Sequence, residues 1–508
     1  MEIPAYTCLP QGRRDGKNDL EKVILFSYIG SLIILFTFGS HGFIMVYYYL
    51  KHRHKRDDFS GTMDGFPVVT IQLPVYNEMY VVERLIKATC EIDYPLDKLE
   101  IQVLDDSTDE TTSIAENIVK EYRLRGFDIV LVHRTDRSGY KAGALKEGLI
   151  SAKGEFVAIF DADFIPRKNF LQIVLPFFKD KKIGMVQTRW EHLNRSYSLV
   201  TQIQALALDG HFVIEQQVRN KANYFINFNG TSGIWRKECI FDAGNWEADT
   251  LTEDLDLSYR AQLKGWKFKY LTDFTTPSEV PSEINSLKSQ QFRWTKGAVE
   301  TARKMLFRVW RSEYPLKLKI MSTFHLTNNI VFPFILLSCL LNLPVVLIKN
   351  TGRYDIYFTF MSVFVLAFIA SFLFYVFSQK DVYEDWRTRV LLFPVFMAGS
   401  MGFAINNTKA VFEGLIKKKS EFVRTPKYGI EKIEDTWKDK KYAHQKIKFS
   451  VFLEMFVSLY SFAGVVVSIV TLQIAAIPFQ LMFAFGFGFV AFLSIRHVID
   501  YNKKAKTA

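Results

Sequence analysis

The sequence contains few cysteines, and those it has are far apart. Among 508 residues there are four, namely Cys8, Cys90, Cys239 and Cys339. Disulfide-dependent secreted domains have many cysteines in a short chain, and zinc sites built from cysteine need closely paired residues. This spacing therefore excludes a disulfide-rich scaffold and a cysteine-based zinc centre.

Two common nucleotide-binding motifs are also missing. No Gly-x-Gly-x-x-Gly follows the first predicted strand, and no P-loop occurs anywhere in the chain. The net charge of +11 does not indicate nucleic acid, because the basic runs at 51–56, 417–419 and 503–506 lie beside apolar segments. That placement is typical of the flanks of membrane helices. We therefore expect no nucleic-acid partner.

Long apolar runs are abundant, although 23% of the residues are charged and 49% are hydrophobic. This composition favours a soluble domain combined with membrane helices. A membrane-spanning helix needs about 20 apolar residues, which the run 23–50 supplies. Because a charged stretch precedes this run without a convincing cleavage site, we expect a membrane helix and not a cleaved signal peptide.

The apolar runs divide the chain into eight predicted parts. The part between the first run and the later ones is polar enough to be one water-soluble domain. The predicted parts are an extracytoplasmic segment (1–22), a membrane helix (23–50), a soluble domain (57–300), an interfacial helix (301–317), two membrane helices (318–378), an interfacial region (389–447), two further membrane helices (449–496) and a cytoplasmic tail (497–508).

Charge distribution predicts the orientation of these parts. The basic run at 51–56 places the soluble domain in the cytoplasm under the positive-inside rule. If every later apolar run crossed the membrane, the basic run at 417–419 would lie outside. The run 390–416 carries polar residues in its second half, so we expect it to lie in the interface or to re-enter. The prediction is a five-span protein of a plasma, inner or Golgi-type membrane.

The soluble domain alternates strand and helix patterns. Strands are predicted at 68–73, 99–104, 128–133 and 156–160, and helices at 80–90, 111–125 and 141–151. The first strand is expected to stop at Pro74. This alternation predicts an α/β fold with a mainly parallel sheet covered by helices on both faces. Ligands bind such sheets at the carboxyl ends of the strands, where Asp105, Asp106, Asp161 and Asp163 fall.

The acidic residues at these strand ends indicate a metal site. Asp161 and Asp163 are separated by one residue and could share Mg²⁺ or Mn²⁺, which would bridge to the diphosphate of a nucleotide. An isolated Asp-x-Asp is more often a solvated turn. The acidic pair Asp105–Asp106 favours the metal, because two acidic strand ends repel each other unless a cation lies between them.

Two further motifs lie on predicted helices. Asp254 precedes a helix at 255–264 and could act as general base toward a hydroxyl, or else Thr252 or Asp254 caps that helix. Gln290, Arg293 and Trp294 are three and four residues apart and share one helix face. Arginine suits a phosphate and tryptophan suits stacking on a sugar ring.

Seven motifs together resemble those of family 2 glycosyltransferases, and they occur in the same order. They lie at 74–78, 105–109, 139–145, 161–163, 229–233, 252–254 and 290–294. More narrowly, the chain resembles membrane-embedded, processive β-glycan synthases of the cellulose-synthase type, including the mannan and glucan synthases. Phe-Val-Arg-Thr-Pro-Lys at 422–427 is similar to the gating loop of those enzymes, although Arg424 stands where they have valine.

The resemblance implies a GT-A type nucleotide-sugar-binding domain fused to transmembrane helices. It also implies roles for individual residues. Tyr76, Glu78, Asp105, Asp106, Lys141, Asp161, Gln290, Arg293, Thr425 and Lys427 would bind the nucleotide sugar, Asp161 and Asp163 the metal, Trp294 and Asn229 the acceptor, and Asp254 would be the base.

The expected activity is inverting, processive synthesis of a β-linked glucan, mannan or glucomannan. The expected donor is UDP-glucose or GDP-mannose, the acceptor is the growing polysaccharide, and membrane lipid is a further partner. One alternative is a non-processive transferase that glycosylates a lipid carrier or glycolipid, which would not need Gln290, Arg293, Trp294 or the loop. The other is a transporter or channel whose soluble domain only senses a nucleotide.

Overall fold

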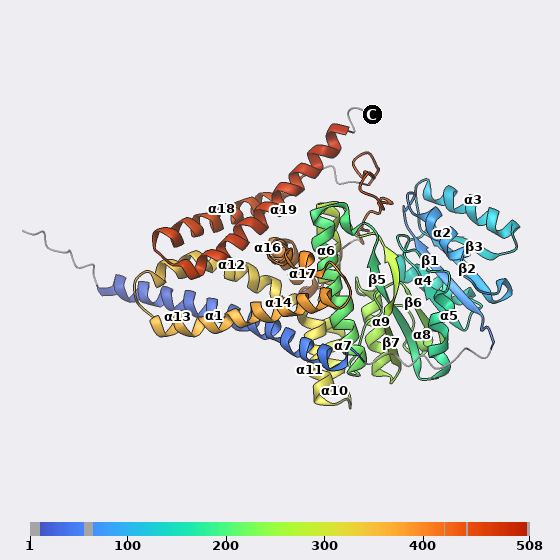
Figure 1. Ribbon diagram of the computed structural model, residues 1–508, viewed down its shortest axis with the longest axis horizontal. Coiled ribbons are helices and arrows are strands. Elements are labelled where there is room, and N and C mark those ends of the chain that lie inside the picture. The colour runs from blue at the N-terminus through green and yellow to red at the C-terminus, as the bar shows by residue number, and fades with distance from the viewer. Residues whose placement is uncertain (1–10, 55–64, 421, 443–445, 505–508) are drawn as a thin grey trace, which may run out of the picture.

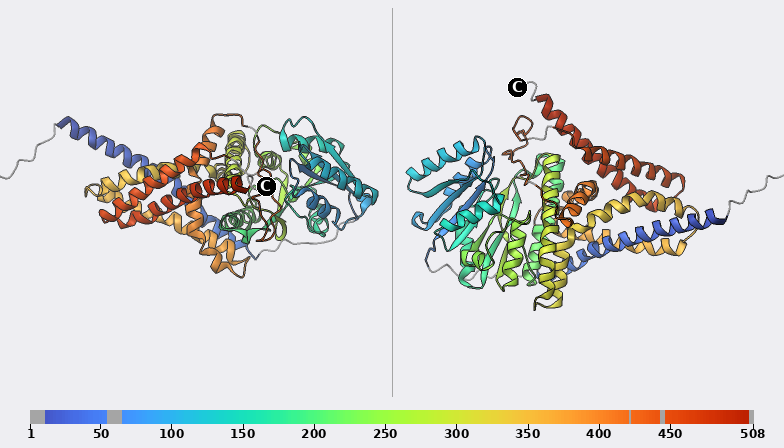
Figure 2. Two further views of the ribbon diagram at one scale, coloured as in Figure 1. Left: turned by 90° about the horizontal axis from the view of Figure 1, so that it is seen from above. Right: turned by 180° about the vertical axis from the view of Figure 1, so that it is seen from behind.

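The computed structural model describes residues 11–54, 65–420, 422–442 and 446–504. Six sequence predictions extend beyond these ranges, namely the segment 1–22, the basic runs 51–56 and 503–506, the soluble domain 57–300, the interfacial region 389–447 and the tail 497–508. Figure 1 shows a twisted sheet with its covering helices on one side and a bundle of long helices on the other. The views in Figure 2 show the same separation from above and from behind.

The sheet has seven strands in the order β3-β2-β1-β4-β6-β5-β7 among the described residues. Only β6 runs antiparallel to its two neighbours. The mainly parallel sheet that the sequence predicts is therefore confirmed. The strands are β1 (Val69–Val75), β2 (Leu99–Asp105), β3 (Asp128–His133), β4 (Phe156–Ile159), β5 (Ile183–His192), β6 (Gly233–Arg236) and β7 (Lys267–Ser278).

Two apolar cores cover the two faces of the sheet. Successive strand residues point to opposite faces, so Ala158 of β4 belongs to one core while Val157 and Ile159 belong to the other. The first core includes α2 (Val82–Cys90), α3 (Thr111–Leu124) and α5 (Phe170–Val174). The second includes α4 (Tyr140–Ser151), α8 (Lys237–Asp242) and α9 (Glu253–Leu263).

The first strand passes through Pro74, contrary to the prediction that it stops there. The N–H of Phe160 donates to the carbonyl of Gln72, so Gln72 faces β4. Pro74 lies two residues further and faces the same side, where β4 has already ended at Ile159. The missing N–H of proline therefore costs no ladder hydrogen bond, and β1 continues to Val75.

The helical region contains five helices that are long and apolar enough to cross a membrane, within the described residues. They correspond to the five predicted spans. The candidate spans are Asp19–His52 in α1 (Gln11–His52), Leu316–Lys349 in α11 (Leu316–Thr327) and α12 (Val331–Lys349), Asp355–Lys380 in α13 (Asp355–Met361) and α14 (Val365–Lys380), Phe449–Val470 as α18, and Ile474–Lys503 ending in α19 (Ile477–Lys504).

A sixth apolar segment is bent. The helices at Trp386–Gly402 and Ala404–Leu415 meet at 48°, within the run 390–416 that we expect to be interfacial or re-entrant. Its elements are α15 (Trp386–Val390), α16 (Phe393–Gly402) and α17 (Ala404–Leu415). Helix α16 packs closely on α19, because a Cβ on Gly402 would lie 2.3 Å from the carbonyl oxygen of Gly486. Small residues let helix backbones approach each other in this way.

One predicted boundary is wrong. Residues 301–311 do not form a separate interfacial helix, because they are the end of α10 (Ile284–Arg311), which also carries the 290–294 motif. The helix stops before Pro315, which occupies the N-cap of α11 and cannot donate an N–H to a preceding turn. Helix α19 continues into the predicted tail as far as Lys504.

Two shorter helices, α6 (Leu199–Asp209) and α7 (Gln216–Lys221), join the sheet to the bundle.

Candidate active site

A cleft opens at the carboxyl ends of β1 and β4. The start of α9, the middle of α10 and the loop 422–427 close its other sides. All but one of the predicted site residues line it, although they come from parts of the chain more than 300 residues apart. The lining residues among them are Tyr76, Glu78, Asp106, Lys141, Asp161, Asp163, Asn229, Asp254, Gln290, Arg293, Trp294, Thr425 and Lys427.

Asp105 is the exception, and its predicted contact with the nucleotide is not supported by its position. Its carboxylate is fully buried and accepts hydrogen bonds from the Ser107 N–H at 3.0 Å and the Thr112 hydroxyl at 2.7 Å. It also lies 2.8 Å from Nδ1 of His133. Asp105 and Asp106 point to opposite sides because they are consecutive at a strand end. Asp106 alone reaches the cleft, where Arg134 binds it at 2.6 and 2.7 Å.

Asp161 and Asp163 follow β4 and lie against two lysines. Nζ of Lys141 is 2.6 Å from Asp161 and also donates to the carbonyl of Gly230 at 2.7 Å. Lys427 forms an ion pair with Oδ2 of Asp163. The other oxygen of Asp163, Oδ1, is buried and has no hydrogen-bond partner among the residues described.

These carboxylates fit a divalent cation. Carboxylate oxygens are preferred ligands of Mg²⁺ and Mn²⁺, and the buried, unpartnered Oδ1 of Asp163 is a donor of that kind. Seven acidic and five basic side chains line the cleft, so its lining carries two more acidic groups than basic ones. Asp161 and Asp163 are the residues that would hold the ion.

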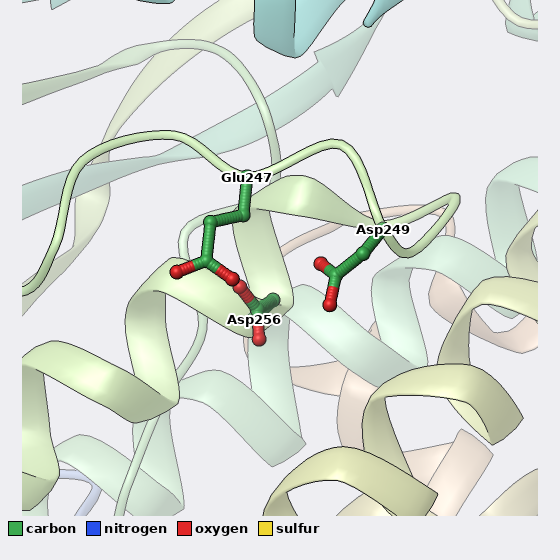
Figure 3. A group of neighbouring side chains, drawn as sticks. All are labelled: Glu247, Asp249 and Asp256. Atoms are coloured by element: carbon green, nitrogen blue, oxygen red, sulfur yellow. The ribbon is translucent and has the colours of Figure 1, made fainter.

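A second acidic cluster is held together by an ion-pair network. Figure 3 shows the carboxyl groups of Glu247, Asp249 and Asp256 gathered together. Nζ of Lys304 lies 2.6, 2.8 and 3.0 Å from these three groups, and Arg260 is 2.8 Å from Asp256. An ammonium group therefore occupies the centre of the cluster. The network holds α9, which begins at the cleft, against α10.

Asp254 lies in the first turn of α9 and has an unusual pKa. Burial, first of all, and the neighbouring Glu253 raise that pKa to about 7, against the opposing effect of Lys141. Oδ1 of Asp254 accepts a hydrogen bond from the Leu255 N–H at 2.8 Å. The alternative expectation that the Thr252 side chain caps this helix is wrong, since its hydroxyl contacts that of Thr301 at 3.1 Å and makes no capping bond.

Gly230 permits the close approach of the 229–233 motif to Asp254. Its φ is +81°, and a Cβ at this position would lie 3.0 Å from Oδ2 of Asp254 and 3.3 Å from Nζ of Lys141. Any larger residue would be strained by its backbone and would crowd both charged groups. The glycine therefore brings the carbonyl that binds Lys141, and the neighbouring Asn229, beside the predicted base.

Asn229 contacts His211, which is in turn held by Glu215, and the sequence did not single out either of these two residues. The amide Nδ2 of Asn229 donates to Nε2 of His211 at 3.0 Å, and Nδ1 of the same ring lies 2.9 Å from Glu215. In this arrangement His211 donates from Nδ1 and accepts at Nε2. Both residues belong to a π-helical turn at Gly210–Glu215, a distortion that is frequent at functional sites. The only sequence signal was their spacing of four residues.

The loop 422–427 lies across the cleft. Arg424 forms a 3.0 Å ion pair with Glu78, and the ring of Phe422 packs on Tyr140 with centroids 5.6 Å apart. Burial raises the pKa of Glu78 to about 7, against the effect of Arg424. The hydroxyl of Thr425 is buried and lacks a hydrogen-bond partner within the described residues. Arg424, the departure from the family pattern, is therefore paired with another residue of the cleft.

Both ends of this loop are tied to the sheet domain by residues that sequence reasoning missed. The carboxylate of Glu279 accepts hydrogen bonds from the Tyr428 and Gly429 N–H groups at 3.1 and 2.8 Å. Lys296, which is fully buried on α10, donates to the carbonyl of Lys418 at 2.5 Å. Each is a single charged residue, so no local pattern could have distinguished them.

Comparison with known sequences identifies relatives of this chain. A family described as "Glycosyltransferase like family 2" matches residues 67–297. "Probable glucomannan 4-beta-mannosyltransferase 4" of Oryza sativa subsp. japonica is 42% identical over 279 residues, 53% of this chain and 51% of the relative. "Glucomannan 4-beta-mannosyltransferase 9" of Arabidopsis thaliana is 33% identical over 408 residues, 77% of this chain and 73% of the relative. The rice relative is thus matched over about half its length.

Comparison with solved structures identifies a similar fold. The mannosyltransferase PcManGT from Pyrobaculum calidifontis, solved in complex with GDP-Man and Mn²⁺, matches with a TM-score of 0.54 and 20% sequence identity. The match covers 78% of this chain and 100% of that chain. It confirms the GT-A type fold that the sequence predicts for the soluble domain.

Proposed function

The chain belongs to glycosyltransferase family 2, in its cellulose-synthase-like branch, and on this basis we propose that it transfers mannosyl units from GDP-mannose to a growing β-linked glycan. One observation carries the proposal. Asp254, a buried carboxylate with a pKa of about 7, lines the same cleft as Trp294 and as two carboxylates that fit a divalent cation, Asp161 and Asp163. A protein that only senses a nucleotide would need neither a general base nor a tryptophan that stacks on an acceptor sugar.

The choice of donor rests on the relatives. The sequence by itself left UDP-glucose and GDP-mannose as alternatives. Both plant relatives are described as glucomannan 4-beta-mannosyltransferases, and the archaeal structure of similar fold is described with GDP-Man. These descriptions support GDP-mannose and give no support to UDP-glucose. A β-1,4-linked mannan or glucomannan is then the proposed product.

The chemistry assigns one step to Asp254. The acceptor hydroxyl oxygen attacks the anomeric carbon, the bond from that carbon to the diphosphate oxygen breaks, and Asp254 accepts the hydroxyl proton. Displacement at an α-linked donor inverts the anomeric centre, so no enzyme nucleophile is required. A base whose pKa lies near the working pH is well suited to this transfer.

The departing diphosphate needs positive charge. A dication held by Asp161 and Asp163 supplies Lewis-acid stabilisation of that leaving group when bound. Lys427 and Arg293 line the same cleft and would add fixed cations to it. The unpartnered hydroxyl of Thr425 is available to donate to a phosphate oxygen. Tyr76, whose ring lies 3.3 Å from the guanidinium of Arg137, would border the nucleotide base.

The helical region supports export of the product. The described part of the chain has five candidate spans, and α10, which bears the cleft residues Gln290, Arg293 and Trp294, precedes the second of them. We propose that the sheet domain lies in the cytoplasm, as the basic runs indicate, and that the glycan crosses the membrane while it grows. Processive addition follows from stacking on Trp294 and coverage by the loop 422–427.

The activity test uses the purified full-length chain in lipid nanodiscs. Radiolabelled GDP-mannose should be converted to polymer that β-1,4-mannanase digests, and UDP-glucose offered alone should not be polymerised. A single sugar on a lipid extractable in organic solvent would support the lipid-carrier alternative instead. Binding of GDP-mannose without turnover would support the sensor alternative.

Processivity gives a prediction for Trp294. Trp294→Ala should shorten the polymer and slow elongation by about tenfold, because aromatic contacts of this type contribute roughly 0.5–1.5 kcal/mol. Hydrolysis of the donor should change less, since the residue addresses the acceptor. Product size and free GDP, measured in the same reaction, separate the two effects. Trp310→Ala, an exposed position on the same helix, is the matched control. Equal losses in both variants would contradict the stacking role.

The Arg424–Glu78 ion pair gives a further prediction. Arg424→Val leaves a buried carboxylate without its cation, so GDP affinity and thermal stability should fall. In a Glu78→Gln background the same change should cost less, with a coupling energy of about 1–3 kcal/mol. Calorimetric titration of GDP into the wild type, both single variants and the double variant measures this coupling. Additive effects would show that the pair does not hold the loop on the cleft.

A further inference from the structure

A groove lies on the surface of the helix bundle, away from the cleft. It has a volume of about 490 Å³ and runs between the end of α1 and the start of α11. In Figure 1 these two helices meet beside the sheet domain. Its lining is almost entirely apolar, with one charged residue, and consists of Phe43, Ile44, Tyr47, Tyr48, Lys317, Ile320 and Met321.

The residues of α1 change in character along the groove. Ile44 lies three and four residues before Tyr47 and Tyr48, and Lys51 lies four and three residues after them, so these residues border one face of the helix. Phe43 and Ile44 lie deepest in the candidate span, the tyrosines follow, and Lys51 stands at the end nearest the sheet domain. This order of apolar, aromatic and basic residues matches the layers of one membrane leaflet.

Helix α11 repeats the order in the opposite direction. Lys317 lies at its first turn, beside the sheet domain, and Ile320 and Met321 lie one turn deeper. The ammonium of Lys317 donates to the hydroxyl of Tyr48 and stands 4.4 Å from the centre of its ring. Lys317 therefore stands at Tyr48 at one end of the groove, and Lys51 lies just outside the lining, one helical turn beyond Tyr48.

The groove walls are open to the surroundings. Phe43, Ile44, Tyr47 and Ile320 keep 38, 44, 59 and 41% of their surface exposed. Exposed apolar side chains on helices of this length are typical of contact with acyl chains. The basic end adds charge complementarity to a phosphate, since lysines near a membrane surface attract anionic lipids.

We propose that this groove binds one anionic glycerophospholipid from the leaflet on the side of the sheet domain. Its acyl chains would lie along the apolar walls, and its phosphate would lie at Lys51 and Lys317. A bound lipid would brace α1 against α11, which leads through α12 into the rest of the bundle. The site is independent of the glycosyl-transfer chemistry, so either proposal can fail alone.

Native mass spectrometry of the full-length chain in neutral detergent tests the site. The chain is incubated with phosphatidylserine or phosphatidylcholine of identical acyl chains, and retained lipid is counted. We expect one tightly retained phosphatidylserine and weaker retention of phosphatidylcholine. Lys51→Gln and Lys317→Gln should each weaken phosphatidylserine retention by about fivefold. Lys349→Gln, at the far end of the same candidate span, should leave it unchanged.

A second variant keeps both lysines and fills the groove. Ile320→Trp should reduce retention of phosphatidylserine by crowding the acyl chains, and it serves as the test if the lysine variants fold poorly. Equal retention of the two lipids, or unchanged retention in the lysine variants and in Ile320→Trp, would overturn the proposal. Tighter binding of a polyprenyl phosphate, or a dimer of the chain that excludes lipid, would overturn it as well.

Discussion

Asp254→Asn should slow glycosyl transfer by about 10²–10⁴-fold, the usual cost of losing a general base. Asparagine keeps the volume of the side chain, and its amide oxygen can still accept from the Leu255 N–H, but it cannot accept a proton. Affinity for GDP-mannose should be nearly unchanged because the residue addresses the acceptor hydroxyl. Initial rates at saturating donor, together with donor affinity, measure both effects.

The pH dependence assigns the effect to this carboxyl group. Burial and Glu253 raise the pKa of Asp254 to about 7, so the group is protonated and inactive below that pH. The wild-type rate should therefore rise with pH through about 7 and then level off. Burial raises the pKa of Glu78 and of Glu279 to about 7 as well, so a rise in rate near this pH does not by itself identify Asp254. The decisive observation is that the rise in rate disappears in Asp254→Asn. The control Asp273→Asn, at an exposed position on β7, should keep it.

One outcome would remove Asp254 from the chemical step. If Asp254→Asn lost donor affinity but kept its turnover at saturation, the carboxylate would belong to the binding site. A normal rate in the variant would equally contradict the assignment.

Asp163→Asn should abolish transfer while the protein still folds. The substitution removes one charge from the pair that fits a dication and leaves Lys427 without its carboxylate partner. EDTA should produce the same loss in the wild type, and Mg²⁺ or Mn²⁺ should restore activity. Direct binding of Mn²⁺, followed by electron paramagnetic resonance, provides a measurement that does not depend on turnover.

The acidic cluster of Figure 3 provides the matched control for this experiment. Asp249→Asn removes one carboxylate from a group that is already ion-paired with Lys304 and Arg260, so Mn²⁺ binding and the response to EDTA should stay normal. Loss of Mn²⁺ binding in Asp249→Asn, with normal binding in Asp163→Asn, would move the metal site to that cluster. Full activity of Asp163→Asn in the presence of EDTA would remove the dication from the mechanism.

The sequence by itself determined four of the seven strands in the described sheet, the helices between them and the strand ends at which the site residues gather. Alternating apolar patterns predicted β1 to β4 to within two residues, because side-chain periodicity is a local property of the chain. Acidic residues at the ends of β2 and β4 predicted that the ligand site lies at one edge of the sheet, because parallel strands bring their carboxyl ends together. The apolar runs predicted the five candidate spans through length and composition alone.

Only the tertiary structure decided which neighbouring residues face the cleft and what surrounds them. Asp105 and Asp106 are adjacent in sequence, yet the first is buried against His133 and the second lines the cleft. Likewise Pro74 could remain inside β1 only because β4 ends at that level. Such outcomes depend on which element packs against a residue, and no local pattern contains that information.

The same reason explains the residues that sequence reasoning missed. Lys296 and Glu279, and also Arg424, whose pairing with Glu78 was not predicted, each bind a partner more than 100 residues away in the chain. The pKa of Asp254 is likewise set by burial that exists only in the folded protein. Residue types and their spacing thus determined the fold class and the chemistry, whereas long-range packing decided the orientation, pairing and protonation of each side chain.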